Sequence, residues 1–333
     1  MTLPLMDGQT VDLTPEECWG MLARAQQYLA ERGHFFELNS RESWRLLGKT
    51  RDHLIQRFGE TDALRTVQRN NRCFQVTGVT SAGFWNSLEA GRWEPDTLRI
   101  LDHFLSGERV FIDIGAWIGP TAFYGAQRAG LTLAFEPDPV AFYELESNVR
   151  ANAHADWASR LRIFNRAIAP QAGNLRIGNL SRGGDSMSSS LFAEAQTSWE
   201  VEASTLDEVM ATEGLEDQAI FLKVDIEGGE YALLPALAHW LRSPDVVAFV
   251  SVHPHFLITR LLPERGNGPL TRVLRRLLLL WHHARFLRAM KFKYLYRSDG
   301  RPLRRLPELL ALFLRGRFAP EILGTNRRWR QPS

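Results

Sequence analysis

One short stretch, residues 110–121, constrains the fold of this 333-residue chain more than any other. It reads VFIDIGAWIGPT and combines an apolar run, an acid near the end of that run, and two glycines. The β-branched and aromatic run is typical of a buried parallel strand. From Pro120 onward the pattern is that of a helix. Because a strand, a glycine turn and a helix together present backbone N–H groups to a ligand, we predict a ligand-binding turn here.

The glycine spacing in this turn decides between two classes of ligand. A dinucleotide-binding turn has the pattern G-x-G-x-x-G, but the second and third glycine positions, counted from Gly115, hold Trp117 and Pro120. Asp113 stands two residues before Gly115, and Gly119 follows four residues after it. We expect glycines here because a Cβ would block the approach of a ligand. The acid favours a cationic ligand over a pyrophosphate.

A second acid follows the next predicted strand. Residues 131–135, LTLAF, form an apolar strand that ends at Glu136. A carboxylate at this position can accept hydrogen bonds from both hydroxyls of a ribose. Each feature alone also fits a purely structural turn, whereas the two acids and the glycine turn together favour a ligand site.

Five motifs follow one another along the chain: DIGAWIGPT, AFEPDP, LESNVRAN, STLDEV and KVDIEGGE. In this order they resemble the FkbM family of S-adenosylmethionine-dependent methyltransferases. The positions that match the family pattern are Asp113, Gly115, Ala116, Gly119, Glu136, Pro137, Pro139, Asn148, Asn152, Thr205, Leu206, Asp207, Lys223, Asp225, Glu227, Gly228 and Glu230. Trp117 departs from the pattern, which often has Asn there, and we expect it to alter how the methionine end of the cofactor is held.

The resemblance implies a fold and a cofactor. The fold is the Rossmann-like α/β fold of class I methyltransferases, a doubly wound and mostly parallel seven-stranded sheet, and the cofactor is S-adenosylmethionine. The segment LRIFNRAI is predicted as the third strand, whose end near Ala167 usually lies beside the adenine in this fold. The cofactor-binding residues implied are Glu94, Asp113, Gly115, Ala116, Gly119, Glu136, Pro137, Ala167 and Asp225. The assignment of Glu94 to the cofactor site is implied by the resemblance of RWEPDT to a family element before the first strand.

The predicted catalytic residues follow the fourth and fifth strands. The segment AIFLKVDIEGGE places Asp225, Glu227 and Glu230 directly after an apolar strand. Three neighbouring carboxylates are costly unless a cationic ligand, a metal, a bound proton or a salt bridge to Lys223 neutralises them. His253 ends the fifth strand at the same sheet edge and is a candidate base. We therefore predict Asp225, Glu227 and His253 as catalytic, with no resident metal. A divalent cation held by the carboxylates remains the competing hypothesis.

The chain divides into two predicted parts. Residues 1–107 are predicted as a mostly helical extension, with helices over residues 14–31 and after residue 40. Residues 108–333 are predicted as the methyltransferase domain, with basic helical insertions after residue 256 and two closing strands in KFKYLYR and PEILGTN. Residues 257–333 contain 18 Lys and Arg but only 4 Asp and Glu, whereas residues 1–256 contain 22 and 34. This asymmetry indicates a polyanionic contact for the C-terminal part.

Several features bear on location and partners. The two cysteines, Cys18 and Cys73, have no metal-type spacing and fit a reducing cytoplasm. The N-terminus lacks a signal-peptide pattern, and the longest apolar run is far below the ~20 residues of a spanning helix. We expect a cytoplasmic protein and hypothesise peripheral contact of its basic C-terminal part with the anionic inner face of the membrane. Nucleic acid is not an expected partner, and the oligomeric state is not indicated.

The function predicted from the resemblance is methyl transfer to a hydroxyl oxygen of a sugar, a glycan or a natural product, so the partner is a small-molecule or glycan acceptor. Two other classes stay open. A nicotinamide-dependent oxidoreductase is disfavoured by the failed glycine spacing. A non-catalytic nucleotide- or membrane-binding module is disfavoured by the intact group of acids after the fourth strand.

Overall fold

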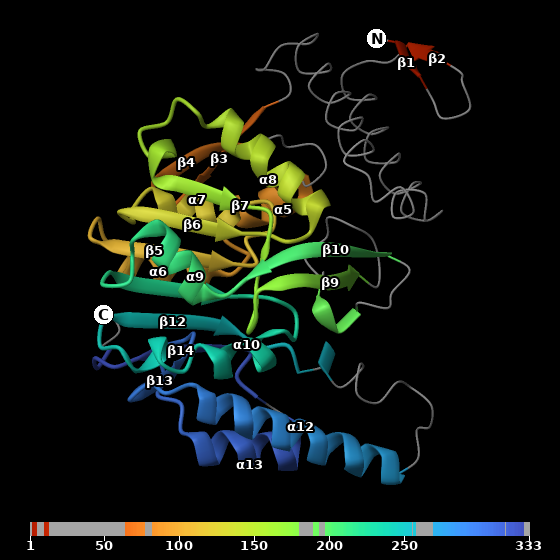
Figure 1. The fold of residues 1–333 in the computed structure, drawn as a ribbon, viewed down its shortest axis with the longest axis vertical. Helices are drawn as coiled ribbons and strands as arrows, with labels where there is room; N and C mark the ends of the chain where they lie inside the picture. The colour runs from red at the N-terminus through yellow and green to blue at the C-terminus, as the bar shows by residue number, and fades with distance from the viewer. Residues whose placement is uncertain are drawn as a thin grey trace.

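The computed structural model describes residues 2–4, 10–12, 64–76, 82–179, 189–192, 197–254, 256–257, 269–316 and 318–329. Its centre is a seven-stranded sheet in the order β13-β14-β12-β11-β5-β6-β7 (Figure 1). The strands are β5 (Arg109–Ile114), β6 (Leu131–Phe135), β7 (Leu161–Phe164), β11 (Ala219–Val224), β12 (Val246–Ser251), β13 (Tyr294–Arg297) and β14 (Glu321–Thr325). The five neighbouring strands β12, β11, β5, β6 and β7 pair in parallel. Strand β14 is antiparallel to both of its neighbours. The prediction of a mostly parallel seven-stranded sheet is confirmed.

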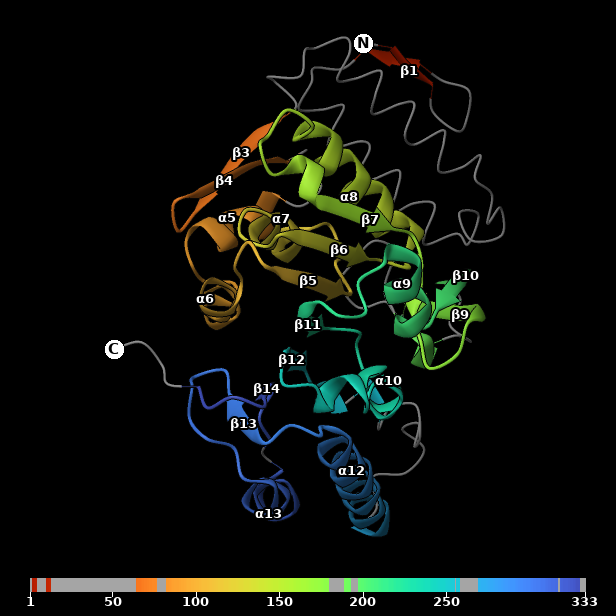
Figure 2. The same ribbon diagram turned by 60° about the vertical axis from the view of Figure 1, so that its left-hand side comes forward.

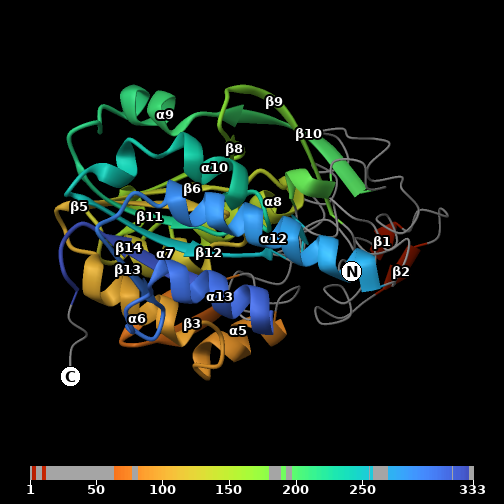
Figure 3. The same cartoon turned by 90° about the horizontal axis from the view of Figure 1, so that it is seen from below.

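Helices cover both faces of this sheet, as the view from below shows (Figure 3). They are α5 (Ala82–Glu89), α6 (Pro95–Phe104), α7 (Pro120–Ala126), α8 (Pro139–Ala151), α9 (Leu206–Glu213), α10 (Glu230–Ala236), α12 (Pro269–Ala289) and α13 (Arg305–Arg315). Alternate strand residues face opposite ways. Ile112 and Leu222 therefore pack toward α9, α10 and α12, whereas Phe111 and Phe221 pack with residues of α6 and α7.

The strand order places the ligand-binding edge. The chain runs outward from β5 through β6 to β7, then returns to β11 on the other side of β5. The point where the order reverses lies between β5 and β11. In open parallel sheets the crevice at the carboxyl ends of the strands at such a point binds ligands. The turns after β5, β6, β11 and β12 all open onto this edge.

The N-terminal part is described only in pieces. β1 (Thr2–Pro4) pairs antiparallel with β2 (Thr10–Asp12), and β3 (Arg65–Arg69) pairs with β4 (Arg72–Val76). Asn70 and Asn71 have φ angles of 48° and 59°, the conformation of a two-residue hairpin turn. The helices predicted over residues 14–31 and after residue 40 lie outside the described residues. The domain boundary at residue 108 stays a prediction.

The prediction of one continuous third strand over LRIFNRAI is wrong. β7 ends at Phe164, and β8 (Ala167–Ile168) belongs to a separate sheet with β9 (Gly173–Asn179) and β10 (Thr197–Ser204). The Asn165 side chain donates to the backbone oxygen of Glu136 at 2.9 Å. This side-chain bond to the chain leaving β6 takes the place of a further strand-to-strand bond, so the chain turns away at Asn165.

The C-terminal part contains the predicted helices and closing strands. Helix α12 precedes β13, and α13 lies between β13 and β14. The two helices lie side by side below the sheet, as the turned view shows (Figure 2). Among the described residues, the helices are too short or too polar to cross a bilayer.

Candidate active site

A cavity of about 870 Å³ opens at the carboxyl ends of the parallel strands. This volume is within the range of small-molecule sites. The polar and charged side chains in its lining come from separate turns and strands: Glu94, Thr121, Glu136, Arg166, Ser189, Ser190, Lys223, Asp225, Glu227, Ser251, His253 and Glu321. Acids therefore outnumber bases among the side chains that line the cavity.

The turn after β5 is held by the protein's own backbone. The N–H groups of Gly115 and Ala116 both donate to the carbonyl of Phe135 at 3.0 Å. Gly115 has a φ of 85°, and a Cβ there would overlap the carbonyl oxygen of Asp225. Gly119 has a φ of 101°, and its Cβ would meet the ring of Phe123. Both glycines are therefore required by internal packing, which differs from the ligand clearance that the sequence suggested.

Glu136 is fixed by two backbone donors. The N–H groups of Trp117 and Asp138 donate to its two carboxylate oxygens, each at 2.8 Å. The residue is only 6% exposed. Burial, with a contribution from the neighbouring Asp138, raises the pKa of Glu136 to about 8. Since each oxygen retains a lone pair, hydroxyl donors from a ligand would favour the ionised form.

Asp113 lies below the cavity and is not among the residues that line it. It is fully buried, accepts a hydrogen bond from the Thr121 hydroxyl at 2.6 Å, and lies 3.6 Å from the Lys223 ammonium. Burial raises the pKa of Asp113 above its usual range despite these two partners. The structure therefore places Asp113 where it can anchor Lys223 and the start of α7. Gly119, another predicted cofactor residue, is also outside the lining.

The other predicted cofactor residues line the cavity: Glu94, Gly115, Ala116, Glu136, Pro137, Ala167 and Asp225. Glu94 immediately precedes α6 and has a left-handed backbone, with a φ of 36°. Its carboxylate accepts a hydrogen bond from the Thr97 hydroxyl at 2.9 Å. Burial, and then the charge of Asp225, raise the pKa of Glu94 to about 7.

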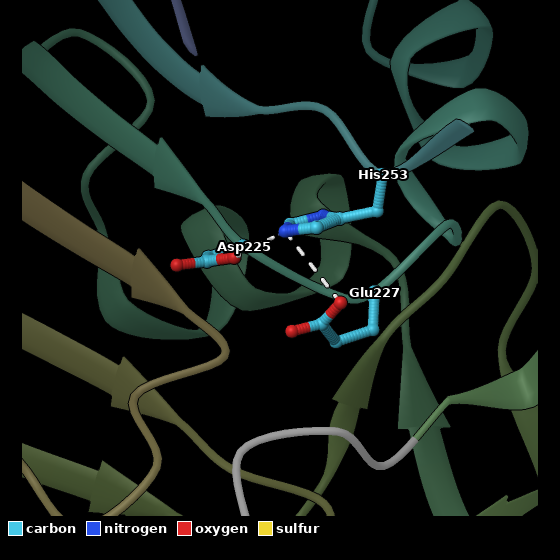
Figure 4. A group of neighbouring side chains, drawn as sticks. All are labelled: Asp225, Glu227 and His253. Carbon is cyan, nitrogen blue, oxygen red and sulfur yellow. Dashed lines mark ion pairs between the residues drawn. The ribbon is translucent and has the colours of Figure 1, made fainter. Parts of the chain in front are cut away.

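The three predicted catalytic side chains converge on one another (Figure 4). Strands β11 and β12 pair in parallel, with Val224 opposite Val250, so their following turns are neighbours. The Nε2 atom of His253 lies 3.7 Å from Asp225 Oδ1 and 3.5 Å from Glu227 Oε2. Asp225 also contacts the Lys223 ammonium at 3.1 Å. Burial opposes its ionisation, but Lys223 and His253 hold the pKa of Asp225 below its usual range.

Glu230 has a different place from its two neighbouring acids. The backbone N–H groups of Gly228 and His253 donate to its carboxylate at 2.7 and 2.6 Å. Its side chain is fully buried, and burial raises its pKa to about 7. Glu230 therefore fixes the backbone of His253 from behind. In the sequence Glu230 stands with the other two carboxylates, and spacing alone does not indicate which groups each carboxylate contacts.

The cluster also has the donor set of a metal site. One ligand atom from each of Asp225, Glu227 and His253 lies within 4.8 Å of the other two. Carboxylate oxygens and an imidazole nitrogen suit several divalent cations. The same distances suit an imidazole that accepts a proton between two carboxylates. The geometry is therefore compatible with both hypotheses for the cluster, a His253 base and a divalent cation.

An aromatic wall completes the cavity. The ring of Phe84 lies edge-on to those of Trp93 and Trp117, with centroids 5.1 and 4.6 Å apart, and all three residues line the cavity. Phe84 could not be predicted from the sequence, because an isolated aromatic residue in a helix carries no spacing signal. The indole of Trp117 is therefore part of a group that narrows the cavity beside Gly115.

Comparison with known proteins agrees with this geometry. Residues 113–277 match the family described as the methyltransferase FkbM domain. This match agrees with the resemblance that the five motifs indicate.

Similarity to individual proteins is more distant. Among solved structures, a methyltransferase FkbM from Methylobacillus flagellatus KT aligns at 17% identity with a TM-score of 0.34. The alignment covers 53% of this chain and 43% of that one, so this chain spans less than half of that protein's length. No curated protein matches the sequence.

Proposed function

We propose that this protein transfers a methyl group from S-adenosylmethionine to a hydroxyl oxygen of a sugar, a glycan or a natural product. The observation that supports this most directly is the convergence of His253, Asp225 and Glu227 on the same cavity that Glu136 lines. The family match supports a methyltransferase. S-adenosylmethionine supplies a methyl group that is already electrophilic. The protein's tasks are then to align the acceptor and to accept its proton.

The residues near β5 and β6 fit the nucleoside end of such a cofactor. The Glu136 carboxylate is already oriented by two backbone N–H groups and has capacity for two ribose hydroxyls. Buried acids nearby, Asp225 and Glu94, suit the positively charged sulfonium and ammonium groups. Both line the same cavity as Glu136.

The residues near β11 and β12 fit the acceptor. His253 is the better base at neutral pH, since the reference pKa of His is ~6.5 and that of Asp ~3.9. Asp225 and Glu227 face its Nε2 atom at 3.7 and 3.5 Å and would stabilise the imidazolium formed when it accepts the proton. A divalent cation on the same three side chains would instead acidify the hydroxyl directly.

One experiment separates these mechanisms. An extract from cells of the source organism that lack the protein supplies unmethylated acceptors, and mass spectrometry follows methyl incorporation from labelled S-adenosylmethionine. If His253 is the base, His253→Ala lowers the rate by about 10²–10⁴, leaves cofactor affinity unchanged, and chelator has no effect. If a metal acts, chelator abolishes the reaction and His253→Ala is milder.

A matched control and a binding measurement complete this test. His239→Ala removes an exposed histidine that pairs with Asp207 and should retain full activity. Isothermal titration should show binding of S-adenosylmethionine. Tight binding of NADH without binding of S-adenosylmethionine would instead favour the oxidoreductase alternative. A fully active His253→Ala enzyme that is insensitive to chelator would show that both assignments for the cluster are wrong.

A further inference from the structure

Every large apolar side chain that is exposed in the described residues lies on one of two helices. On α12 they are Val273, Leu274, Leu277 and Trp281, and on α13 they are Leu306, Leu310, Phe313 and Leu314. Their exposed fractions range from 41% to 67%. Single exposed apolar residues are ordinary, but a group of them marks an interaction surface. We call these eight residues the α12–α13 apolar face.

Helical spacing shows that this face is not the edge of the core. On α12 the exposed residues recur at i, i+1, i+4 and i+8, which is one stripe of a helix. The residues of α12 that enter the core, His283, Phe286 and Leu287, lie on a different side. On α13 the exposed stripe opposes the buried Leu312 in the same way. Each helix therefore has one apolar side for the core and a second one for solvent.

The two stripes belong to one surface. α12 and α13 pack against each other and together form the lowest layer of the molecule in Figure 1, which faces the viewer in Figure 3. Since the core side of each helix faces the sheet above, their second apolar sides face outward.

The charges around this face are almost all positive. Residues 269–316 contain 12 Lys and Arg and 2 Asp and Glu. Both acids already have arginine partners, Glu308 with Arg297 at 2.9 Å and Asp299 with Arg301 at 3.6 Å. The Arg285 guanidinium lies 4.6 Å from the centre of the Trp281 ring. Other exposed cations near the stripes are Arg276, Arg288 and Arg304.

We propose that the α12–α13 apolar face binds the surface of an anionic lipid bilayer, with its apolar side chains between the headgroups and its arginines on the lipid phosphates. Interfacial helices have this combination of an apolar stripe and flanking basic residues. A nucleic acid would use the arginines but gains nothing from eight exposed apolar side chains. A second copy of the chain would bring two positively charged surfaces together. An anionic bilayer matches both the apolar and the basic component.

Packing contacts connect the helices of this face to the candidate active site. α10 begins at Glu230 and packs against α12, where the Tyr231 hydroxyl lies 3.3 Å from His283 Nδ1. Phe318 and Pro320, which follow α13, line the cavity. The lipid contact itself is independent of the proposed methyl transfer, so the two can fail separately.

Vesicle flotation of the full chain tests the proposal. The probes are vesicles of phosphatidylcholine alone and vesicles that also contain phosphatidylserine, each at low and high salt. We expect recovery with the anionic vesicles at low salt and a marked decrease at high salt, because salt screens exposed charges. Equal recovery in all four conditions, or recovery in none, overturns the proposal.

Two pairs of substitutions separate the apolar and basic components. Leu277→Gln with Trp281→Gln should weaken vesicle binding by roughly tenfold or more, since two apolar side chains no longer insert between the lipid headgroups. Arg285→Gln with Arg288→Gln should weaken it by roughly fivefold per arginine. The matched control, Arg92→Gln with Arg242→Gln, removes exposed arginines elsewhere and should bind as the wild type does.

The remaining alternatives give distinct results. Circular dichroism checks that each variant is folded, and Leu310→Gln with Leu314→Gln on α13 repeats the apolar test independently. Binding that depends on the arginines but not on either apolar pair would indicate a soluble polyanion instead. A wild-type dimer that becomes monomeric in the apolar variants, without vesicle binding, would show that the face joins two copies of the chain. Either result overturns the proposal.

Discussion

Glu136 and Asp225 hold equivalent places in the two halves of the sheet edge but differ in their partners. Each is the first residue after a parallel strand, β6 or β11, and both line the same cavity. Burial raises the pKa of Glu136, whose partners are backbone N–H groups, to about 8. Burial also opposes ionisation of Asp225, but the Lys223 ammonium and His253 lower its pKa. The position of an acid in the fold therefore does not determine whether its carboxyl group is ionised. The charge of the groups that contact it does.

Glu230 shows that the partner matters more than the half of the sheet. It lies in the same half as Asp225, yet its hydrogen-bond donors are the backbone N–H groups of Gly228 and His253, with the His253 Nδ1 atom farther away at 3.7 Å. Burial raises its pKa to about 7, as for Glu136. Neutral donors orient a carboxylate without compensating fully for lost hydration. Glu136 and Glu230 are thus oriented by backbone donors, whereas Asp225 is held by paired charges.

The largest expected effect comes from removing the central charge of the Asp225 group. Lys223 is 2% exposed and contacts both Asp113 and Asp225. Lys223→Met leaves two buried carboxylates without their cation and should lower the free energy of unfolding by about 3–5 kcal/mol. Urea denaturation measures this loss. Lys291→Met, at an exposed position, is the control and should change stability by less than about 0.5 kcal/mol. A similarly small effect at Lys223 would contradict the charge-paired description of this group.

The second effect concerns Glu136, whose carboxylate is oriented by backbone donors. Glu136→Ala removes a carboxylate that we propose accepts two hydroxyls of the cofactor ribose. The expected loss of affinity for S-adenosylmethionine is about 1.5–3 kcal/mol for each charge-assisted hydrogen bond at most, measured by isothermal titration. Glu146→Ala, a half-exposed acid on α8 that pairs with Arg150, should leave the affinity unchanged. Equal affinities of the Glu136→Ala variant and the wild type would remove Glu136 from the cofactor site.

The sequence predicted the sheet well because its signals are local. Each parallel strand is an apolar run that ends in a polar residue or a glycine, and right-handed crossovers leave few possible orders. The same logic placed Asp225 and His253 on adjacent turns, which the pairing of β11 with β12 confirms. The break at Asn165 was missed because it depends on a side-chain bond to Glu136, distant in sequence.

The candidate site was less predictable because acids look alike in sequence. Asp113, Glu136 and Glu230 each stand beside a glycine turn or directly after a strand. The structure places Asp113 under the cavity, Glu136 in its wall and Glu230 behind His253. These differences depend on side-chain direction and on partners from other turns, such as Lys223 for Asp113. The spacing of residues in one motif contains no information on either.

Counted per pH unit, the smallest expected effect is on the pH dependence of stability, and it differs in sign between the two acids. The pKa of Glu136 is raised in the folded protein. Its contribution to stability is therefore fully present below the unfolded pKa, near ~4.3, and is lost as pH rises through about 8. The pKa of Asp225 is lowered. Its contribution is present above the unfolded value of ~3.9 and is lost as pH falls through the folded value.

Substitution by the amide isolates each contribution. Relative to the wild type, Glu136→Gln should become more stable as pH rises from mildly acidic to mildly basic, by about 1.4 kcal/mol per pH unit until the pH reaches about 8. Asp225→Asn should become less stable relative to the wild type as pH rises from the strongly acidic range, and then stay parallel to it. Since Glu94 and Glu230 also titrate near 7 in the wild type, only the difference between variant and wild type is informative. Denaturant unfolding at several pH values gives this difference. If both variants follow the wild type in parallel at every pH, the partners of these two acids do not set their protonation, and the contrast between a backbone-oriented and a charge-paired acid is wrong.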